Sequence, residues 1–176
     1  MNNRLWEKRF QTCLGILAFF ALTTLPASAQ FIADNPDWKE TEVPPPPAFD
    51  LKRLIAVDTP VQSQLKWGID PATIVINKAD GVVRYVIVAQ SSSGVVNAMY
   101  EGIRCNKAEF RRYARHSPSS GWVVSTTSEW TALRDTGTSR HPQTIAKQGM
   151  CDGAAAPISV ADAIRAIRTG GNVSVK

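Results

Sequence analysis

The clearest pattern along the chain is the alternation of apolar and polar residues between positions 51 and 125. Short runs rich in Val, Ile and Tyr are separated by turn residues, such as Asp80-Gly81 and the segment 91–94. A period of two is typical of β-strands. Connections this short join antiparallel neighbours, because a parallel return needs about a dozen residues or more. Strands are predicted at 51–57, 66–69, 73–77, 82–90, 95–104, 109–116 and 121–125.

Two predicted turns determine how the three central strands pair. A two- or four-residue loop at 91–94 and a four-residue loop at 105–108 together define one register. Directly opposed side chains in such a register stabilise a sheet by roughly 0.2–1 kcal/mol per pair. The predicted pairs are Arg84 with Glu101, Glu101 with Arg112, Tyr85 with Tyr100, Tyr100 with Tyr113, and Arg104 with Glu109.

This register places the charged pairs and the tyrosine pairs on opposite faces of the sheet. The charged face is predicted to be the core face, because it also carries Val86, Val88, Met99, Ile103, Cys105, Phe110 and Ala114. The tyrosine face carries apolar residues at one end and arginines at the other. We expect the basic end of this face to be exposed.

The C-terminal part has a helical pattern. Residues 160–168 place apolar side chains on one stripe, Ser159 and Asp162 approximate a capping box, and Gly170-Gly171 ends the helix. A short helical turn is predicted at 128–134, with Thr127 or Ser128 as its N-cap, and a loop at 135–153. The predicted fold class is therefore α+β, a mainly antiparallel β-sheet (a meander) with a C-terminal helix packed on it.

Residues 1–29 have the pattern of a secretory signal peptide. Basic residues precede an apolar run at 13–22, and small residues form a cleavage site between Ala29 and Gln30. The apolar run is too short to span a hydrocarbon core of about 30 Å. We therefore expect a cleaved leader, a periplasmic mature protein and no transmembrane segment after cleavage; an uncleaved N-terminal anchor is the alternative.

The size and charge of the mature chain limit its partners. Removal of the leader from the 176 residues leaves 147, the usual size of one domain. The leader carries three basic residues and one acidic residue, so the net charge of +5 falls to +3. This small excess, and export itself, argue against nucleic acid as a partner. The anionic components of the envelope are the candidates.

The mature chain is predicted to begin with an arm. Residues 30–50 form a proline-rich N-terminal arm, and residues 51–176 a single α+β domain. Four consecutive prolines, Pro44 to Pro47, favour an extended polyproline II segment. Trp38 could dock the arm on the domain; a proline-rich ligand for a partner protein is the alternative.

Two cysteines remain after the leader is removed, Cys105 and Cys151. In an oxidising compartment they predict a disulfide. Closing the loop of 46 residues would stabilise the fold by about 4 kcal/mol in the chain-entropy model. A reactive or metal-binding thiol at Cys151, with His141 near it in sequence, is the alternative. The residues before Cys13 do not form a lipidation motif.

The sequence carries no motif of a known catalytic or metal site. His-Glu-x-x-His, Gly-x-Ser-x-Gly, a Walker loop and Cys-x-x-Cys are all absent. His116 and His141 lack ligand spacing, so we predict exposed loop residues, and neither a metal nor a cofactor. Trp67, Trp122 and Trp130 are expected to be core anchors.

The best candidate for a binding surface is the basic end of the tyrosine face. Arg111 and Arg115 lie on one predicted strand with Tyr113 between them, and Arg104 lies on the neighbouring strand. Guanidinium groups offer forked donors to phosphate and carboxylate groups. These four residues are therefore predicted to bind an anionic group.

Several segments occur in the order and spacing of a known family. They are Asp37-Trp38-Lys39-Glu40, the four prolines, DGVVRY at 80–85 and YEGIRC at 100–105. In these segments, which extend over most of the mature chain, the sequence resembles the cryptic neisserial protein-like family, exported proteins of Gram-negative bacteria whose function is not established. The resemblance implies a periplasmic location and no catalytic residue to carry over. Some relatives look like lipoproteins, whereas this chain lacks the motif.

The sequence thus predicts a periplasmic protein that is more a binding module than an enzyme. Its expected partner is an anionic envelope component or another periplasmic protein. An envelope hydrolase or transferase, with a site assembled from distant loops, is one alternative; a structural protein of the envelope is the other. A pocket that groups His116 or His141 with a carboxylate and a nucleophile would favour the enzyme.

Overall fold

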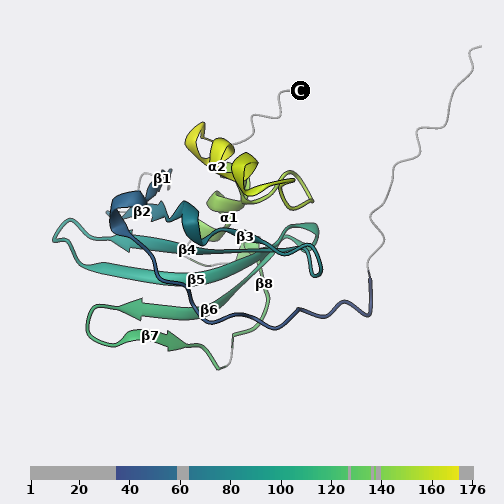
Figure 1. The fold of residues 1–176 in the computed structure, drawn as a ribbon, viewed down its shortest axis with the longest axis horizontal. Helices are drawn as coiled ribbons and strands as arrows, with labels where there is room; N and C mark the ends of the chain where they lie inside the picture. The colour runs from purple at the N-terminus through teal and green to yellow at the C-terminus, as the bar shows by residue number, and fades with distance from the viewer. Residues whose placement is uncertain (1–34, 59–63, 127, 136, 138–139, 171–176) are drawn as a thin grey trace, which may run out of the picture. The chain divides into compact units, whose positions relative to one another are not determined.

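A computed structural model describes residues 35–58, 64–126, 128–135, 137 and 140–170. The predicted leader and its cleavage site lie outside these residues, as does the start of the arm. The described residues group into one compact unit. Figure 1 shows this unit as a curved sheet with helices on one side.

The sheet is antiparallel throughout and follows the chain almost in order. Its main path is β1-β2-β4-β5-β6-β7, while β3 pairs with β4 and β8 pairs with β6. This confirms the predicted α+β fold with a mainly antiparallel sheet. The strands are β1 (Ile55–Val57), β2 (Lys66–Ile69), β3 (Val75–Ile76), β4 (Val82–Gln90), β5 (Val96–Arg104), β6 (Glu109–Ser117), β7 (Gly121–Val124) and β8 (Thr131–Ala132).

The register between β4 and β5 differs from the prediction by one residue. Gln90 lies opposite Val96, so the connecting loop has five residues, an odd number. Arg84 consequently lies opposite Gly102, and Glu101 lies opposite Tyr85. Because a shift of one residue moves side chains to the other face, the predicted pairs Arg84–Glu101 and Tyr85–Tyr100 are wrong.

The register between β5 and β6 is correct for half of its length. Glu101 lies opposite Arg112 and Arg104 opposite Glu109, as predicted. The register then shifts between Tyr100 and Glu101, and β6 has one extra residue there. The predicted pair Tyr100–Tyr113 is therefore wrong, although the two rings still contact each other, with centroids 5.2 Å apart.

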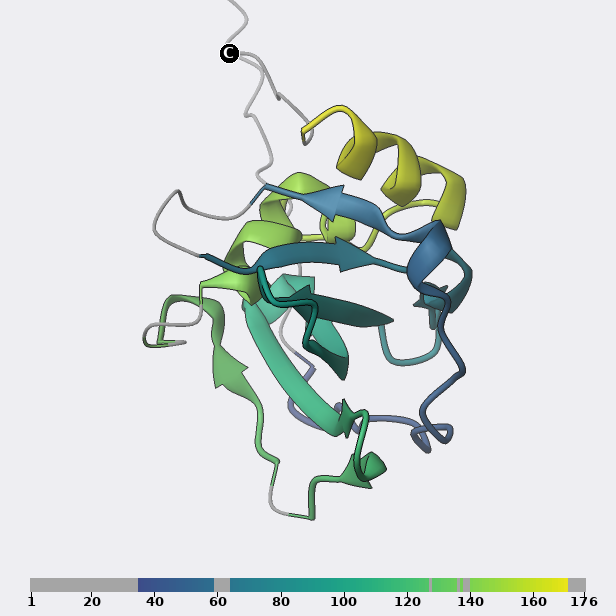
Figure 2. The same cartoon turned by 90° about the vertical axis from the view of Figure 1, so that its left-hand side faces the viewer.

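Both faces of the sheet are covered, whereas the sequence pattern predicted one exposed end. On one face, which we call the helix face, Tyr85, Met99 and Ile103 belong to the larger hydrophobic core. On the other, which we call the arm face, Val86, Tyr100 and Tyr113 form a second core against arm residues. Figure 2 shows α1 and α2 on one side of the sheet and the arm on the other. The face predicted as the core face combined residues that lie on opposite faces: Met99 and Ile103 lie on the helix face, whereas Val86, Val88 and Ala114 lie on the arm face.

The helix α2 (Val160–Arg168) forms as predicted. The side chain of Ser159 accepts a hydrogen bond from the backbone N–H of Asp162 and donates one to its carboxylate. Residues 128–134 do not form the predicted helical turn; they contain β8 and the start of a 3-10 turn. Single 3-10 turns occur at Leu51–Arg53, Pro71–Thr73, Cys105–Lys107 and Leu133–Asp135.

Part of the region predicted as a loop is helical. The α-helix α1 (His141–Ile145) continues into a π-helical turn, η5 (Ala146–Met150). Gly149 in that turn has φ 149°, and a Cβ at this position would lie 2.8 Å from Ala166 Cβ of α2. This glycine therefore lets the turn and α2 approach each other closely.

Candidate functional site

The arm face carries a cluster of charged side chains around Glu40, a residue of the arm. Arg84 donates to one oxygen of the Glu40 carboxylate at 3.0 Å, and Arg111 to the other at 2.8 Å. The hydroxyl of Tyr113 donates to Glu40 as well. Burial, the hydrogen bond to Glu40 and the charge of that carboxylate raise the pKa of Tyr113. The phenol is therefore held as a donor.

A second carboxylate, that of Asp80, also forms an ion pair with Arg84. Arg84 donates to Asp80 at 2.7 Å, and the backbone and hydroxyl of Thr41 donate to the same carboxylate oxygen at 3.1 and 2.6 Å. Burial alone would raise the pKa of Asp80, but the hydrogen bonds from Arg84, Thr41 and Val82 outweigh it and lower the pKa. Arg84 is only 1% exposed, so this pairing is what permits a charge at that position.

Trp38 fixes the arm a few residues earlier. Its indole N–H donates to the carbonyl oxygen of Asp80 at 2.8 Å. The guanidinium carbon of Arg104 lies 3.9 Å from the centre of its ring, and Trp130 packs edge-on at 5.9 Å. The predicted docking of the arm through Trp38 is thus confirmed.

The structure brings together three of the four residues predicted to bind an anion. Arg104, Arg111 and Tyr113 all contact the arm. The expected exposure is wrong for Arg104 and Tyr113, because the arm covers them. Arg115 is exposed but lies opposite Met99, so the extra residue in β6 has moved it away from the other three.

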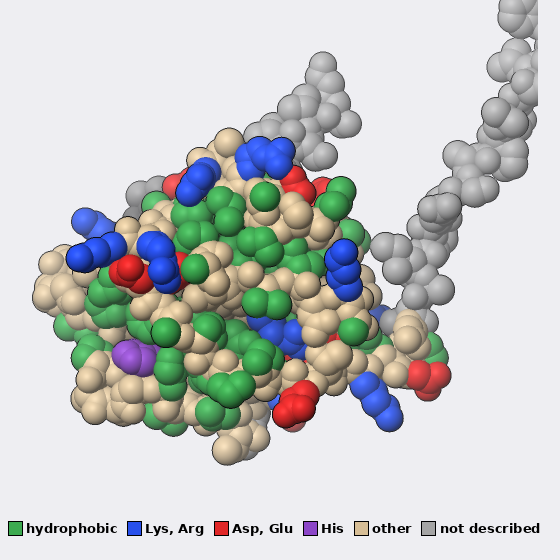
Figure 3. Space-filling model, viewed as in Figure 1, with side chains coloured by type: hydrophobic (Ala, Val, Ile, Leu, Met, Phe, Trp, Pro, Cys, Tyr) green, Lys and Arg blue, Asp and Glu red, His purple; other side chains and the backbone are tan. Residues whose placement is uncertain are grey.

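Basic residues do not gather into one exposed patch on the face seen in Figure 3. There, among the residues that the structure describes, Lys and Arg side chains are dispersed between acidic and apolar ones. Whether the four predicted residues bind an external anion stays a prediction.

The helix face carries a separate cluster around Glu101. His141 Nε2 lies 3.0 and 3.2 Å from the two carboxylate oxygens. Arg112 donates to Glu101 at 2.9 Å, and the Tyr85 hydroxyl at 3.4 Å. The ring of Trp67 stacks on His141, with centroids 4.4 Å apart. Three side chains, from β4, β6 and α1, thus contact one carboxylate of β5, and Trp67 of β2 packs on one of the three.

The cluster is closed to solvent. The side chains of Glu101 and His141 are 0% and 1% exposed, and that of Arg112 is 19% exposed. Burial would raise the pKa of Glu101, but the charges and hydrogen bonds of His141 and Arg112 outweigh it and lower the pKa. Burial and the nearby Glu101 charge raise the pKa of Tyr85 well above its usual value. Tyr85 is therefore a neutral donor and a poor nucleophile at pH 7.

The Glu101–Arg112 pair of this cluster was predicted from the sequence, whereas the contacts of Glu101 with His141 and Tyr85 were not. Sequence analysis assigned His141 to an exposed loop, whereas His141 begins α1, just before Pro142, and is buried. Proline is common in the first turn of a helix, and this was the available signal. The other histidine predicted to be an exposed loop residue, His116, lies near the end of β6 and packs edge-on against Phe49 and Trp122.

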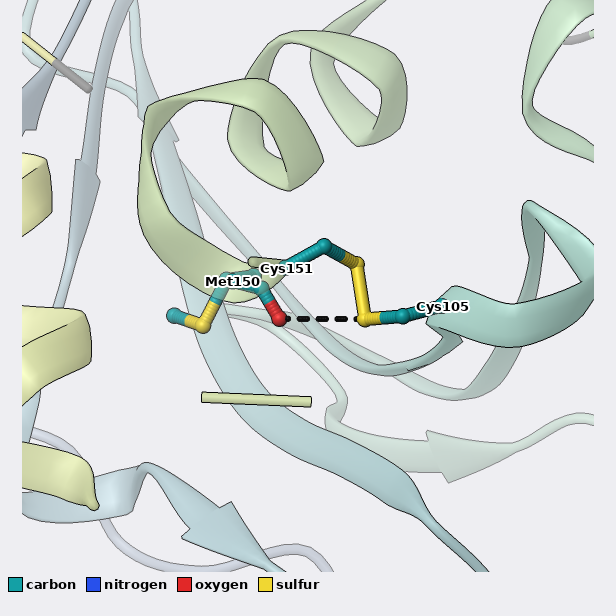
Figure 4. Close-up of a disulfide and its surroundings, with 3 residues drawn as sticks. All are labelled: Cys105, Met150 and Cys151. Atoms are coloured by element: carbon teal, nitrogen blue, oxygen red, sulfur yellow. Dashed lines mark hydrogen bonds between the residues drawn. A yellow bond between two sulfur atoms is a disulfide. The ribbon is translucent and has the colours of Figure 1, made fainter. Parts of the chain in front are cut away.

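The predicted disulfide is present between Cys105 and Cys151, whose Cα atoms are 5.6 Å apart. It joins the end of β5 to the residue after η5 (Figure 4). The carbonyl oxygen of Met150 lies 3.3 Å from Cys105 Sγ, the dashed contact in that figure. A disulfide sulfur carries no hydrogen, so we interpret this as a close polar contact and not as a hydrogen bond.

A hollow of about 820 Å³ lies beside the disulfide. Ala132, Leu133 and Ala146 form apolar parts of its wall together with both cysteines. This volume lies in the range of small-molecule sites, which are concave and mostly apolar with a few polar groups.

Charged residues surround the apolar wall of the hollow. They are the basic residues Lys107, Arg134 and Lys147 and the acidic residues Glu109 and Asp152. Lys147 and Asp152 are exposed, so the hollow can be reached from solvent. Glu109 also lies 3.8 Å from Arg104, and Arg134 lies 3.6 Å from Asp135.

The described residues provide no metal site. Within the described ranges, no group of three or more His, Cys, Asp or Glu side chains could hold a metal ion. No helix in that part of the chain is long and apolar enough to cross a membrane.

Comparison with known proteins gives one match. No curated protein and no solved structure is significantly similar to the chain. A family model, that of the CNP1-like family, matches residues 33–168, from before Trp38 to the end of α2. The match thus includes the arm, the sheet, both charged clusters and the disulfide, and it agrees with the resemblance of the YEGIRC segment. The chain belongs to the CNP1-like family.

Proposed function

We propose that this protein is a non-enzymatic binding module of the bacterial cell envelope, and that it acts in the periplasm after removal of residues 1–29. Two features support this location. The leader has the three parts of a secretory signal peptide. The pair Cys105–Cys151 suits an oxidising compartment, where disulfides persist.

The hollow beside the disulfide is the observation that carries the binding function. The carboxylates of Glu40 and Glu101 are buried, and each is paired with basic side chains of the same chain. The hollow instead combines an apolar wall with exposed cations such as Lys147. Both cysteines line the hollow, so the disulfide links two parts of its wall.

Affinity capture from periplasmic extract tests this proposal. The mature protein is immobilised, and retained molecules are identified by mass spectrometry. Ala132→Trp places an indole at the wall of the hollow, whereas Ala154→Trp adds the same side chain at an exposed position outside it. We expect the same ligand from the wild type and from Ala154→Trp, and at least a tenfold loss with Ala132→Trp. Equal retention by all three proteins, or no retained molecule, would reject the hollow as the binding site.

One observation favours the alternative of an envelope hydrolase. His141, a carboxylate and a hydroxyl meet at Glu101, which is the grouping that sequence analysis named as a sign of an enzyme. General acid–base chemistry requires these groups to reach the substrate, and here they are buried. Hydrolysis of ester, amide and glycoside substrates should therefore not differ between wild type and a folded Glu101→Gln variant. Turnover that depends on Glu101 would establish the enzyme instead.

A further inference from the structure

The arm is bound to the sheet in the manner of a peptide ligand. From Asn35 to Asp50 it contains no strand or helix, and its side chains make the contacts. Trp38 and Glu40 are held by side chains and by one carbonyl of the body, and the backbone N–H of Thr41 donates to the Asp80 carboxylate. Figure 1 shows the arm running across the sheet without joining it. The arm therefore adds no strand to the fold.

The pocket that receives Glu40 is built by the body alone. Arg84 of β4 is buried and fixed by Asp80, and Arg111 and Tyr113 come from β6. Gly102 of β5 makes room for the tyrosine, because a Cβ there would lie 2.9 Å from Tyr113 Cε2. The arm supplies the carboxylate, and its residue Thr41 also donates to the Asp80 oxygen that holds Arg84.

The pocket also has donors that the arm leaves unused. The Nε atoms of Arg84 and Arg111 are buried and have no hydrogen-bond partner, whereas Arg104 Nε lies 3.8 Å from a carboxylate oxygen of Glu109. All three arginines contact Glu40 or Trp38 through the rest of the guanidinium group. Buried polar atoms are usually satisfied. These free donors therefore indicate that the arm does not exhaust the capacity of the pocket.

We propose that this pocket is a receptor for an acidic, aromatic peptide segment of a partner protein, with the pattern Trp-x-Glu, and that the arm of the same chain is its competitor. The pocket recognises a carboxylate through two guanidinium groups and a phenol. The indole site between Arg104 and Trp130 recognises the aromatic side chain two residues before it. None of the described residues that contact Trp38 or Glu40 lines the hollow, although Glu109 at its rim lies 3.8 Å from Arg104. Binding at the two sites can therefore be tested with separate variants.

The competition has a measurable consequence. A receptor that is open for only a fraction of the time binds an external ligand more weakly by that fraction. The tethered arm is present at a high effective concentration, of the order of millimolar for a short linker. Release of the arm should therefore strengthen binding of an external peptide.

The test uses a fluorescent peptide of residues 35–43 and the mature protein with both Trp38→Ala and Glu40→Ala. We expect fluorescence anisotropy to show at least tenfold tighter binding to this variant than to the wild type. A peptide with Glu40→Gln should bind at least tenfold more weakly, whereas a peptide with Glu42→Gln, altered at an exposed position, should bind like the parent. Adding Arg111→Ala to the protein should abolish binding.

Several results would overturn the proposal. One is the absence of peptide binding to the arm variant while it keeps its circular dichroism spectrum and its disulfide. Another is equal binding to the wild type and the variant. If the double variant does not fold, Glu40→Gln alone replaces it; failure of both to fold would make the arm an integral part of the core. A dimer fraction that increases with protein concentration, and that falls when the peptide is added, would show that the pocket binds a second copy of this chain and not a partner protein.

Discussion

Glu40 is the residue that joins the arm to the sheet. Its carboxylate accepts hydrogen bonds from Arg84, Arg111 and Tyr113, and its side chain is 9% exposed. Arg84 and Arg111 lie far from it in sequence, so no local pattern indicates the contact. The cluster depends on Glu40 because Asp80 can neutralise only one of the two guanidinium groups.

A charge-neutral substitution of Glu40 tests this dependence. Glu40→Gln should lower the free energy of unfolding by about 1–3 kcal/mol, because it weakens charge-assisted hydrogen bonds in a buried setting. Urea unfolding followed by tryptophan fluorescence measures the change. Glu42→Gln is the matched control, since Glu42 lies two residues later and is exposed. Equal stability of the two variants would show that the Glu40 contacts contribute nothing.

The same reasoning gives a larger effect for Glu101. Glu101→Gln would leave His141 and Arg112 without their carboxylate, and removing one partner of a buried ion pair costs about 3–5 kcal/mol. Chemical denaturation should show this loss, and the exposed Glu129→Gln should change stability by less than about 0.5 kcal/mol. A loss below about 1 kcal/mol for Glu101→Gln would contradict the closed cluster described above.

Gly149 decides how the π-helical turn packs against α2. Its φ of 149° is rarely adopted by other residues, and an added Cβ would also lie 2.9 Å from the carbonyl oxygen of Ala163. Gly149→Ala should therefore cost about 2 kcal/mol or more. Gly121→Ala separates the two causes, because Gly121 also has a positive φ, 65°, but a Cβ there would meet no atom within 4 Å. The melting temperature should fall clearly more for Gly149→Ala than for Gly121→Ala.

The elements that sequence analysis predicted correctly are those with local signals. The helix α2 has a capping serine, an apolar stripe and terminal glycines. The turn between β4 and β5 was predicted, but the residue pattern does not define the length of its loop. The loop has five residues in place of the predicted two or four, and this odd number shifts the pairing of β4 with β5 by one residue. The π-helical turn was missed because α1 has no side-chain cap and Gly149 has an unusual conformation.

The alternating pattern of the sequence also did not predict that both faces of the sheet are covered. Residues Val82–Ala89 of β4 are all buried, which is the burial of a strand between two layers. The apolar character of this strand indicates that both of its faces are buried, but it does not indicate which segment covers the second face. That segment is the arm, whose polar and proline-rich sequence resembles a linker. Arg104, Arg111 and Tyr113 were singled out by residue type, but their contacts with the arm were not predicted.

Buried carboxylates contribute to the free energy of folding, so the stability of the whole molecule should depend on pH. Glu101, Asp80 and Asp70 have lowered pKa values; burial opposes this shift, and their hydrogen-bond donors, such as Arg53 for Asp70, outweigh it. A lowered folded pKa stabilises the protein above the ordinary values of 4.5 and 3.8, and the stabilisation is lost as the pH falls through the folded values.

Urea midpoints measured from pH 5 down to pH 2 check this dependence. We expect the midpoint to fall steeply below about pH 4 in the wild type. The fall should be shallower in Glu101→Gln, which lacks one of the carboxylates, and unchanged in Glu129→Gln. A midpoint that stays constant to pH 2 would show that the carboxylates are not linked to folding.

Export, disulfide formation and binding of a ligand in the hollow are together the central claim about this protein. Native mass spectrometry of the protein released from the periplasm tests this directly. We predict a chain that begins at Gln30, contains one disulfide and carries a bound molecule that Ala132→Trp does not retain. A chain that begins at Met1, free thiols at Cys105 and Cys151, or an empty wild-type protein would contradict the account.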